Sequence, residues 1–153
     1  MNQWSKGSKG GEGKALSRIL NREDFLYLLD LEVKRARRYQ NFFCILLLKI
    51  HRIQEGDNVG DLKSCYQKLT NLLIEELRDS DILGSLKEDR LAVLLPYVDQ
   101  SDGDQVKSRF HGDLQFCNFA GDGCEVTVDQ ISFPLDGTDS MDLMDKVLGT
   151  ERA

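Results

Sequence analysis

The stretch GSLKEDRLAVLLP, residues 84–96, places four consecutive charged residues between two apolar runs. The runs are DILGSL at residues 81–86 and LAVLLPYV at residues 91–98, and each has the length and composition of a buried strand. A short polar segment between two such runs is typical of a β-turn. The sequence therefore predicts a tight hairpin whose exposed turn is formed by Lys87, Glu88, Asp89 and Arg90.

Outward from this hairpin, the hydrophobic pattern predicts further helices and strands. Apolar residues recur at helical spacing in residues 18–39, 61–78, 101–114 and the second half of 134–148. Asn21 is the expected N-cap of the first helix, and Asp139 or Ser140 lies near the cap of the last. Continuous or alternating apolar runs predict strands at residues 42–50 and 124–133, and a Gly- and Asp-containing segment predicts a loop at residues 51–61. This order predicts a mixed α/β domain, with a mostly antiparallel or mixed sheet of about five strands flanked by helices.

Length and composition restrict the classes of protein that fit. A chain of 153 residues is long enough for one domain, which we place at residues 16–150, after a Gly-, Ser- and Lys-rich leader at residues 1–15. The formal net charge of -6 argues against a general nucleic-acid binder. We expect a cytoplasmic protein without a membrane segment, because there is neither a signal peptide nor a run of ~18 apolar residues.

The four cysteines show neither C-x-x-C spacing nor a dense disulfide framework. They are Cys44, Cys65, Cys117 and Cys124. Reduced and mostly buried thiols are the expectation for a cytoplasmic protein. A link between Cys117 and Cys124 is the alternative in an oxidising compartment, since a hairpin can bring those two positions opposite each other.

Five stretches, in order and in register, resemble the GGDEF domain family of diguanylate cyclases and their inactive relatives over about residues 19–148. They are LNREDF (20–25), EVKRARRYQ (32–40), ILLLKIHRI (45–53), RDSDILGSLKEDRLAVLLP (78–96) and SFPLDG (132–137). The resemblance implies the mixed α/β fold of a nucleotide cyclase. It also implies a relationship to enzymes that make cyclic di-GMP from GTP with carboxylate-bound metal ions.

The departures from the family pattern fall on the residues that the resemblance assigns to catalysis. Lys49 and His51 stand at the two acidic positions of the family's first strand, and the loop at residues 55–61 is too short for the family's usual substrate contacts. The signature itself is changed to Lys87, Glu88, Asp89, Arg90 and Leu91, in which only Asp89 is retained. A lysine repels a divalent cation, and side chains at the two glycine positions obstruct a triphosphate. We therefore expect no enzymatic activity, no bound metal and no cofactor.

One family site is retained by resemblance. Arg78 and Asp81 match an R-x-x-D motif that binds cyclic di-GMP as an inhibitor in the family, and Arg109 matches a basic contact from the next helix. Two interpretations stay open. In the first, the domain is a non-catalytic receptor that binds cyclic di-GMP and regulates a protein partner or its own dimerisation. In the second, Arg78 and Asp81 only pair with each other, Arg109 is solvated, and the domain binds other proteins without a nucleotide.

Overall fold

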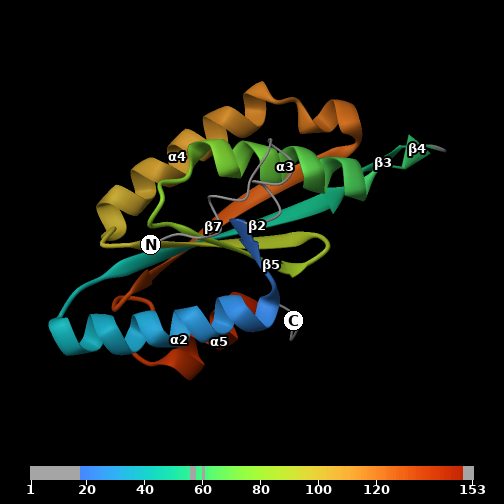
Figure 1. Cartoon of the computed structure of the whole chain (residues 1–153). Coiled ribbons are helices and arrows are strands. Elements are labelled where there is room, and N and C mark those ends of the chain that lie inside the picture. Colours follow the sequence, from blue (N-terminus) through green and yellow to red (C-terminus); the bar gives the residue numbers. More distant parts are fainter. Residues whose placement is uncertain (1–17, 56–57, 60, 150–153) are drawn as a thin grey trace.

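The computed structural model describes residues 18–55, 58–59 and 61–149, so the predicted leader at residues 1–15 lies outside the described residues. A five-stranded mixed sheet with the order β1-β5-β6-β2-β7 forms the centre of the molecule. Helices α3 and α4 cover one face of the sheet, and α2 and α5 cover the other (Figure 1). The predicted fold class is confirmed. No helix in the described part of the chain has the length and apolar character needed to cross a membrane.

The observed elements follow the predicted order. The strands of the main sheet are β1 (Ile19–Leu20), β2 (Phe43–Arg52), β5 (Ile82–Lys87), β6 (Arg90–Pro96) and β7 (Cys124–Phe133). The helices are α2 (Arg22–Tyr39), α3 (Leu62–Glu76), α4 (Gln100–Phe116), the 3-10 turn η2 (Phe119–Asp122) and α5 (Ser140–Leu148). The predicted hairpin is confirmed as the antiparallel pair β5 and β6.

The helix predicted within residues 18–39 begins after its expected N-cap, Asn21. Asn21 accepts a hydrogen bond from the backbone N–H of Asp24 at 2.8 Å and so caps a helix that begins at Arg22. The preceding Ile19–Leu20 forms β1, which pairs in parallel with β5. This strand completes the five, and a two-residue strand is too short to show any periodicity in the sequence.

The predicted loop at residues 51–61 is also wrong in part. Strand β2 continues through Arg52, because its neighbour β7 extends far enough to pair Cys124 with Arg52. The short strands β3 (Gln54–Glu55) and β4 (Asn58–Val59) then form a separate antiparallel hairpin. The length of a strand thus depends on its partner as well as on its own residues.

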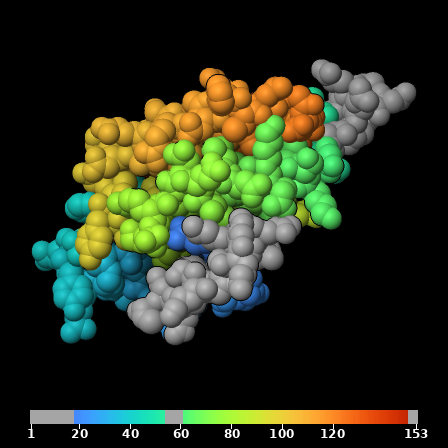
Figure 2. All heavy atoms as spheres, turned by 45° about the horizontal axis from the view of Figure 1, so that its top comes forward, coloured from blue at the N-terminus to red at the C-terminus, as the bar shows by residue number. Residues whose placement is uncertain are grey.

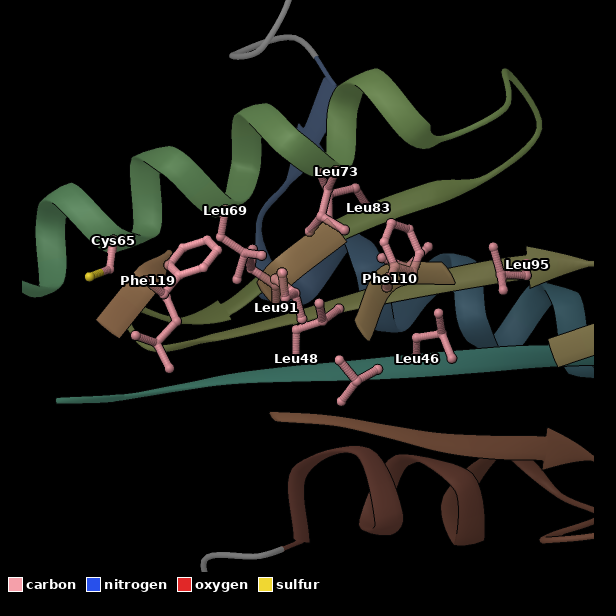
Figure 3. Close-up of a cluster of buried hydrophobic side chains, with 14 of the residues drawn as sticks. Leu46, Leu48, Cys65, Leu69, Leu73, Leu83, Leu91, Leu95, Phe110 and Phe119 are labelled. Carbon is pink, nitrogen blue, oxygen red and sulfur yellow. The ribbon is translucent and has the colours of Figure 1, made fainter. Parts of the chain in front are cut away.

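Strand β2 explains why a continuous apolar run is needed at the centre of the sheet. Its side chains alternate between two buried clusters, because successive strand residues point to opposite faces. Leu46 and Leu48 belong to the cluster beneath α3 and α4, shown in Figure 3, whereas Phe43 and Ile45 belong to the cluster beneath α2 and α5. Both faces are covered, so neither can carry polar side chains in the middle of the strand.

The structure corrects the expectation for the cysteines. Cys65 in α3 and Cys124 at the start of β7 form a disulfide with a Cα–Cα distance of 6.6 Å. Cys44 and Cys117 are free, so the link between Cys117 and Cys124 is not formed. The α3 helix lies over the beginning of β7, and this tertiary contact brings together two cysteines that are 59 positions apart.

Candidate functional site

The three residues of the predicted ligand site converge on one surface cavity. Arg78 follows α3, Asp81 precedes β5, and Arg109 lies in α4. All three line a cavity of about 660 Å³, together with Tyr97 from the end of β6. Figure 2 shows the face of the molecule on which the yellow-green end of α3 lies next to the gold beginning of α4. The tertiary fold therefore groups residues that are distant in the sequence.

Arg78 and Asp81 form a tight local pair inside this cavity. The Asp81 carboxylate accepts the backbone N–H of Arg78 at 2.9 Å and the Arg78 Nη2 at 2.8 Å, while Arg78 Nε lies 3.3 Å from both carboxylate oxygens. The Asp81 side chain is only 3% exposed. Its hydrogen bond to Arg78 raises the pKa of the guanidinium above its usual value, so Arg78 remains charged at any physiological pH. Arg78 and Asp81 therefore form the ion pair that the sequence analysis considered as one of two interpretations.

The Arg78 guanidinium still has donors that face other directions. Its Nη2 also approaches the carbonyl oxygen of Pro96 at 3.5 Å. Within the described part of the chain, its Nη1 makes no hydrogen bond. Since Asp81 fixes one edge of the planar group, the remaining N–H groups have a defined direction for a ligand acceptor.

Arg109 is held by a carboxylate on the opposite side of the cavity. Its Nε donates to Oε1 of Glu76 at 3.2 Å, and both side chains are partly exposed. Glu75 and Asp102 also line the cavity, so four carboxylates face two guanidinium groups. An anionic ligand must therefore compete with Glu76 for Arg109 and approach a lining with excess negative charge.

Tyr97 is the cavity residue that the sequence did not predict. The strand was expected to continue to residue 98, but β6 ends at Pro96 and Tyr97 adopts a left-handed backbone conformation with φ 60°. Its backbone N–H donates to the carbonyl oxygen of Phe42 at 3.0 Å. The Pro96 at the end of the apolar run was a signal for the end of the strand, but no local signal indicated a positive φ at a tyrosine.

The charged turn differs from the prediction of four exposed residues. Only Glu88 and Asp89 form the turn, because Lys87 and Arg90 are paired as the last and first residues of β5 and β6. Arg90 is only 8% exposed, which corrects its predicted exposure. Leu91 is fully buried in the core, where an apolar side chain is required. The carbonyl oxygen of Asp89 accepts the backbone N–H of Ile50 at 2.8 Å, which ties the turn to β2.

Lys49 and His51 lie near the end of β2, at the positions where the family resemblance implies metal-binding carboxylates. Lys49 is half-buried between Arg90 of β6 and Thr127 of β7 in the strand register. His51 is exposed, and its Nε2 lies 3.3 Å from Thr127 Oγ1. Among residues 18–55, 58–59 and 61–149, no three His, Cys, Asp or Glu side chains are grouped so that they could hold a metal ion. The residues present do not fit the divalent metal of a cyclase, because cationic groups occupy this end of the strand pair.

A second cavity of about 550 Å³ includes Glu88 of the charged turn in its lining. Arg52, Tyr66, Ser85 and Glu88 are among the residues that line it, with the first turn of α3 at its edge. The hydroxyl of Tyr66 donates to Ser85 Oγ at 2.8 Å across this cavity. Of residues 87–91, all of which the structure describes, Glu88 lines this cavity.

Comparison with known proteins agrees with this architecture. The model of the family described as "Diguanylate cyclase, GGDEF domain" matches residues 15–125, which is most of the chain. The matched range runs from before β1 to the start of β7 and contains the residues named above as lining the two cavities. The chain belongs to the GGDEF domain family. No curated protein sequence matches the chain.

Solved structures show the same GGDEF fold. A DGC protein from Thermotoga maritima is 22% identical, with a TM-score of 0.72 over 91% of this chain and 98% of that one. The GGDEF domain of TpbB (YfiN) from Pseudomonas aeruginosa is 20% identical, with a TM-score of 0.70 over 88% and 86% of the two chains. The GGDEF domain of DgcB from Caulobacter crescentus, solved in complex with c-di-GMP, is 12% identical, with a TM-score of 0.57 over 99% and 91%. At these identities the likeness concerns the fold.

Proposed function

We propose that this GGDEF domain is a non-catalytic receptor that binds cyclic di-GMP in the cavity formed by Arg78, Asp81 and Arg109. The observation that carries the proposal is the convergence of these three residues on one cavity of about 660 Å³. A volume of this size is within the range of small-molecule sites. The ligand identity rests on the family resemblance, and the DgcB domain with the same fold was solved with c-di-GMP.

The residue types suit a guanine base and a phosphate. A guanidinium can donate to guanine O6 and N7 together, and a carboxylate can accept from the N–H groups of the same base. Asp81 holds the Arg78 guanidinium in place before any ligand arrives. Arg109 lies across the cavity and supplies a second positive charge for a phosphate, after it leaves Glu76.

We further propose that the domain has no diguanylate cyclase activity. Lys49 and His51 occupy the positions of metal-binding carboxylates, and side chains replace both signature glycines. The position of Lys49 between Arg90 and Thr127 supports the proposal, because a divalent cation would be repelled there. The outcome of ligand binding would be altered association with a protein partner or with a second copy of the chain, since a cyclic dinucleotide has two equivalent halves that can bridge two surfaces.

A second candidate function is a protein-interaction domain that binds no nucleotide. The specific observation in its favour is that both guanidinium groups already have carboxylate partners, Asp81 for Arg78 and Glu76 for Arg109. In this case cyclic di-GMP would cause no rise in the thermal unfolding temperature, because only a ligand of the native state stabilises it.

Arg109→Ala is expected to reduce the affinity for cyclic di-GMP by about 10-fold or more, because a hydrogen bond to a charged group contributes about 1.5–3 kcal/mol. Arg78→Ala should have a larger effect, but it also removes the partner of the nearly buried Asp81 and thus destabilises the fold. In the part of the chain that the structure describes, the ion-pair partner of Arg109 is the partly exposed Glu76, so the Arg109 variant tests binding without that complication. Calorimetric titration of both variants and the wild type measures the effect.

The control variant is Arg37→Ala, which removes an exposed arginine of α2 that does not line the cavity. It should bind like the wild type. Unchanged affinity in both Arg78→Ala and Arg109→Ala would reject the site, and the absence of binding to the wild type would reject the receptor.

GTP with Mg²⁺ serves as the comparison ligand, and its conversion to cyclic di-GMP would reject the proposed lack of catalysis. Light scattering with and without cyclic di-GMP tests the change in association.

Glu76→Gln is expected to increase the affinity for cyclic di-GMP by about two- to fivefold, because it removes the charge that competes for Arg109. Glu75→Gln is the matched control, since Glu75 also lines the cavity and its replacement removes the same charge. Glu75 forms no ion pair with Arg109, so its variant should show only the smaller effect of net charge. Equal affinities of the two variants would indicate that competition for Arg109 is unimportant.

A further inference from the structure

Tyr97 combines three features at the wall of the candidate ligand cavity. It has φ 60°, which is unfavourable for a bulky residue. The residue is 59% exposed although it is a large aromatic one, and it is among the residues that line the cavity, with Arg78 and Asp81. Strained backbone persists only where the surroundings impose it, and it is concentrated at ligand sites. The end of strand β6 alone does not account for an exposed tyrosine with a positive φ at the cavity.

The Tyr97 ring is held in a fixed position from α2. The guanidinium carbon of Arg35 lies 4.6 Å from the ring centroid, and Arg35 Nη1 donates to the Tyr97 hydroxyl oxygen at 2.9 Å. Arg35 is in turn bound by Glu32, which accepts from both Nε and Nη2. A ring that is oriented before binding loses little conformational entropy when a ligand contacts it.

We propose that Tyr97 is the stacking platform for a purine base of the ligand held by Arg78 and Asp81. Arg78 and Asp81 would recognise the edge of the base, and the tyrosine ring would contact its face. Arg35 covers one face of the ring, and the base would use ring surface that is open to solvent. Aromatic rings bind nucleobases in this way because every base has a π face. The inference rests on the proposed receptor function and adds a residue that determines the class of ligand.

The decisive experiment compares Tyr97→Phe with Tyr97→Asn by calorimetric titration of cyclic di-GMP. Phenylalanine loses the hydroxyl and its hydrogen bond from Arg35 but keeps the ring and the contact of its face with the Arg35 guanidinium, so its affinity should stay within about threefold of the wild type. Asparagine tolerates the left-handed conformation but has no ring, so its affinity should fall by about 10- to 100-fold. Tyr97→Gly also fits the backbone and should behave like the asparagine variant. Thermal unfolding without ligand verifies that each variant is folded.

A spectroscopic measurement separates stacking from a structural role. The ring protons of Tyr97, assigned by their loss in Tyr97→Phe, should shift in the NMR spectrum when cyclic di-GMP is added, because a stacked base imposes its ring current. Wild-type affinity in Tyr97→Asn, together with the expected fall in affinity in Arg109→Ala, would overturn the platform and leave the receptor function intact. Absence of any binding to the wild type would overturn both.

Discussion

Phe110→Ala is expected to lower the free energy of unfolding by about 3–5 kcal/mol. Phe110 is fully buried on the inner side of α4, in the cluster that includes Leu46, Leu83 and Leu95 (Figure 3). Removing the ring loses its burial and leaves a cavity that the strands beneath cannot fill. This helix has few other apolar anchors, because its buried residues are only Gly103, Phe110 and Leu114.

Urea denaturation of the unliganded protein measures this effect. Phe116→Ala is the matched control, since Phe116 belongs to the same helix and is 90% exposed. Its replacement should change the free energy of unfolding by no more than about 0.5 kcal/mol. The midpoint of the Phe110 variant should fall while the slope stays near the wild-type value. Similar losses in the two variants would show that α4 does not pack on the sheet as described.

Reduction of the disulfide between Cys65 and Cys124 is expected to lower the free energy of unfolding by about 4 kcal/mol. The two cysteines are separated by 59 positions, and the bond closes a segment that contains α3, β5, β6 and α4. A cross-link over so long a segment removes much of the entropy of the unfolded chain. The effect therefore acts mainly on the unfolded state and requires no change in the folded core.

Denaturation with and without a reducing agent measures the contribution of the disulfide. The double variant Cys65→Ala and Cys124→Ala should lose its response to the reducing agent, whereas Cys117→Ala should respond like the wild type. Thiol titration of the unfolded, unreduced protein should find only the two free cysteines, Cys44 and Cys117. Four titratable thiols would restore the sequence-based expectation of a fully reduced protein.

Hydrophobic pattern and local caps were sufficient to predict most of the fold. The continuous apolar run in β2 and the two runs on either side of the charged turn each matched a buried strand, because burial on both faces excludes polar residues there. Asn21 was correctly predicted as the N-cap of α2, and Asp139, one of two expected candidates, is the N-cap of α5. These signals are carried by adjacent residues, so they can be identified without knowledge of the tertiary structure.

The candidate site was predicted only in part. The family resemblance supplied Arg78, Asp81 and Arg109, and the fold brings them to one cavity. The ion pair between Glu76 and Arg109 and the position of Tyr97 were missed, because each depends on contacts between elements that are far apart in the sequence. The burial of Arg90 was missed for the same reason, since its turn looked exposed when only the neighbouring residues were considered.

The sequence by itself determined the family and the order of helices and strands, and it places Lys49, Lys87 and Glu88 where the family resemblance implies a carboxylate and two glycines. Those properties reside in residue identities and short-range spacing. The tertiary structure alone decided which cysteines are joined, how Arg35 orients Tyr97, and that the ends of α3 and β6 share a cavity with α4. Packing of α3 and α4 on one face of the sheet creates these contacts, and no local pattern in the chain specifies which distant side chains will meet.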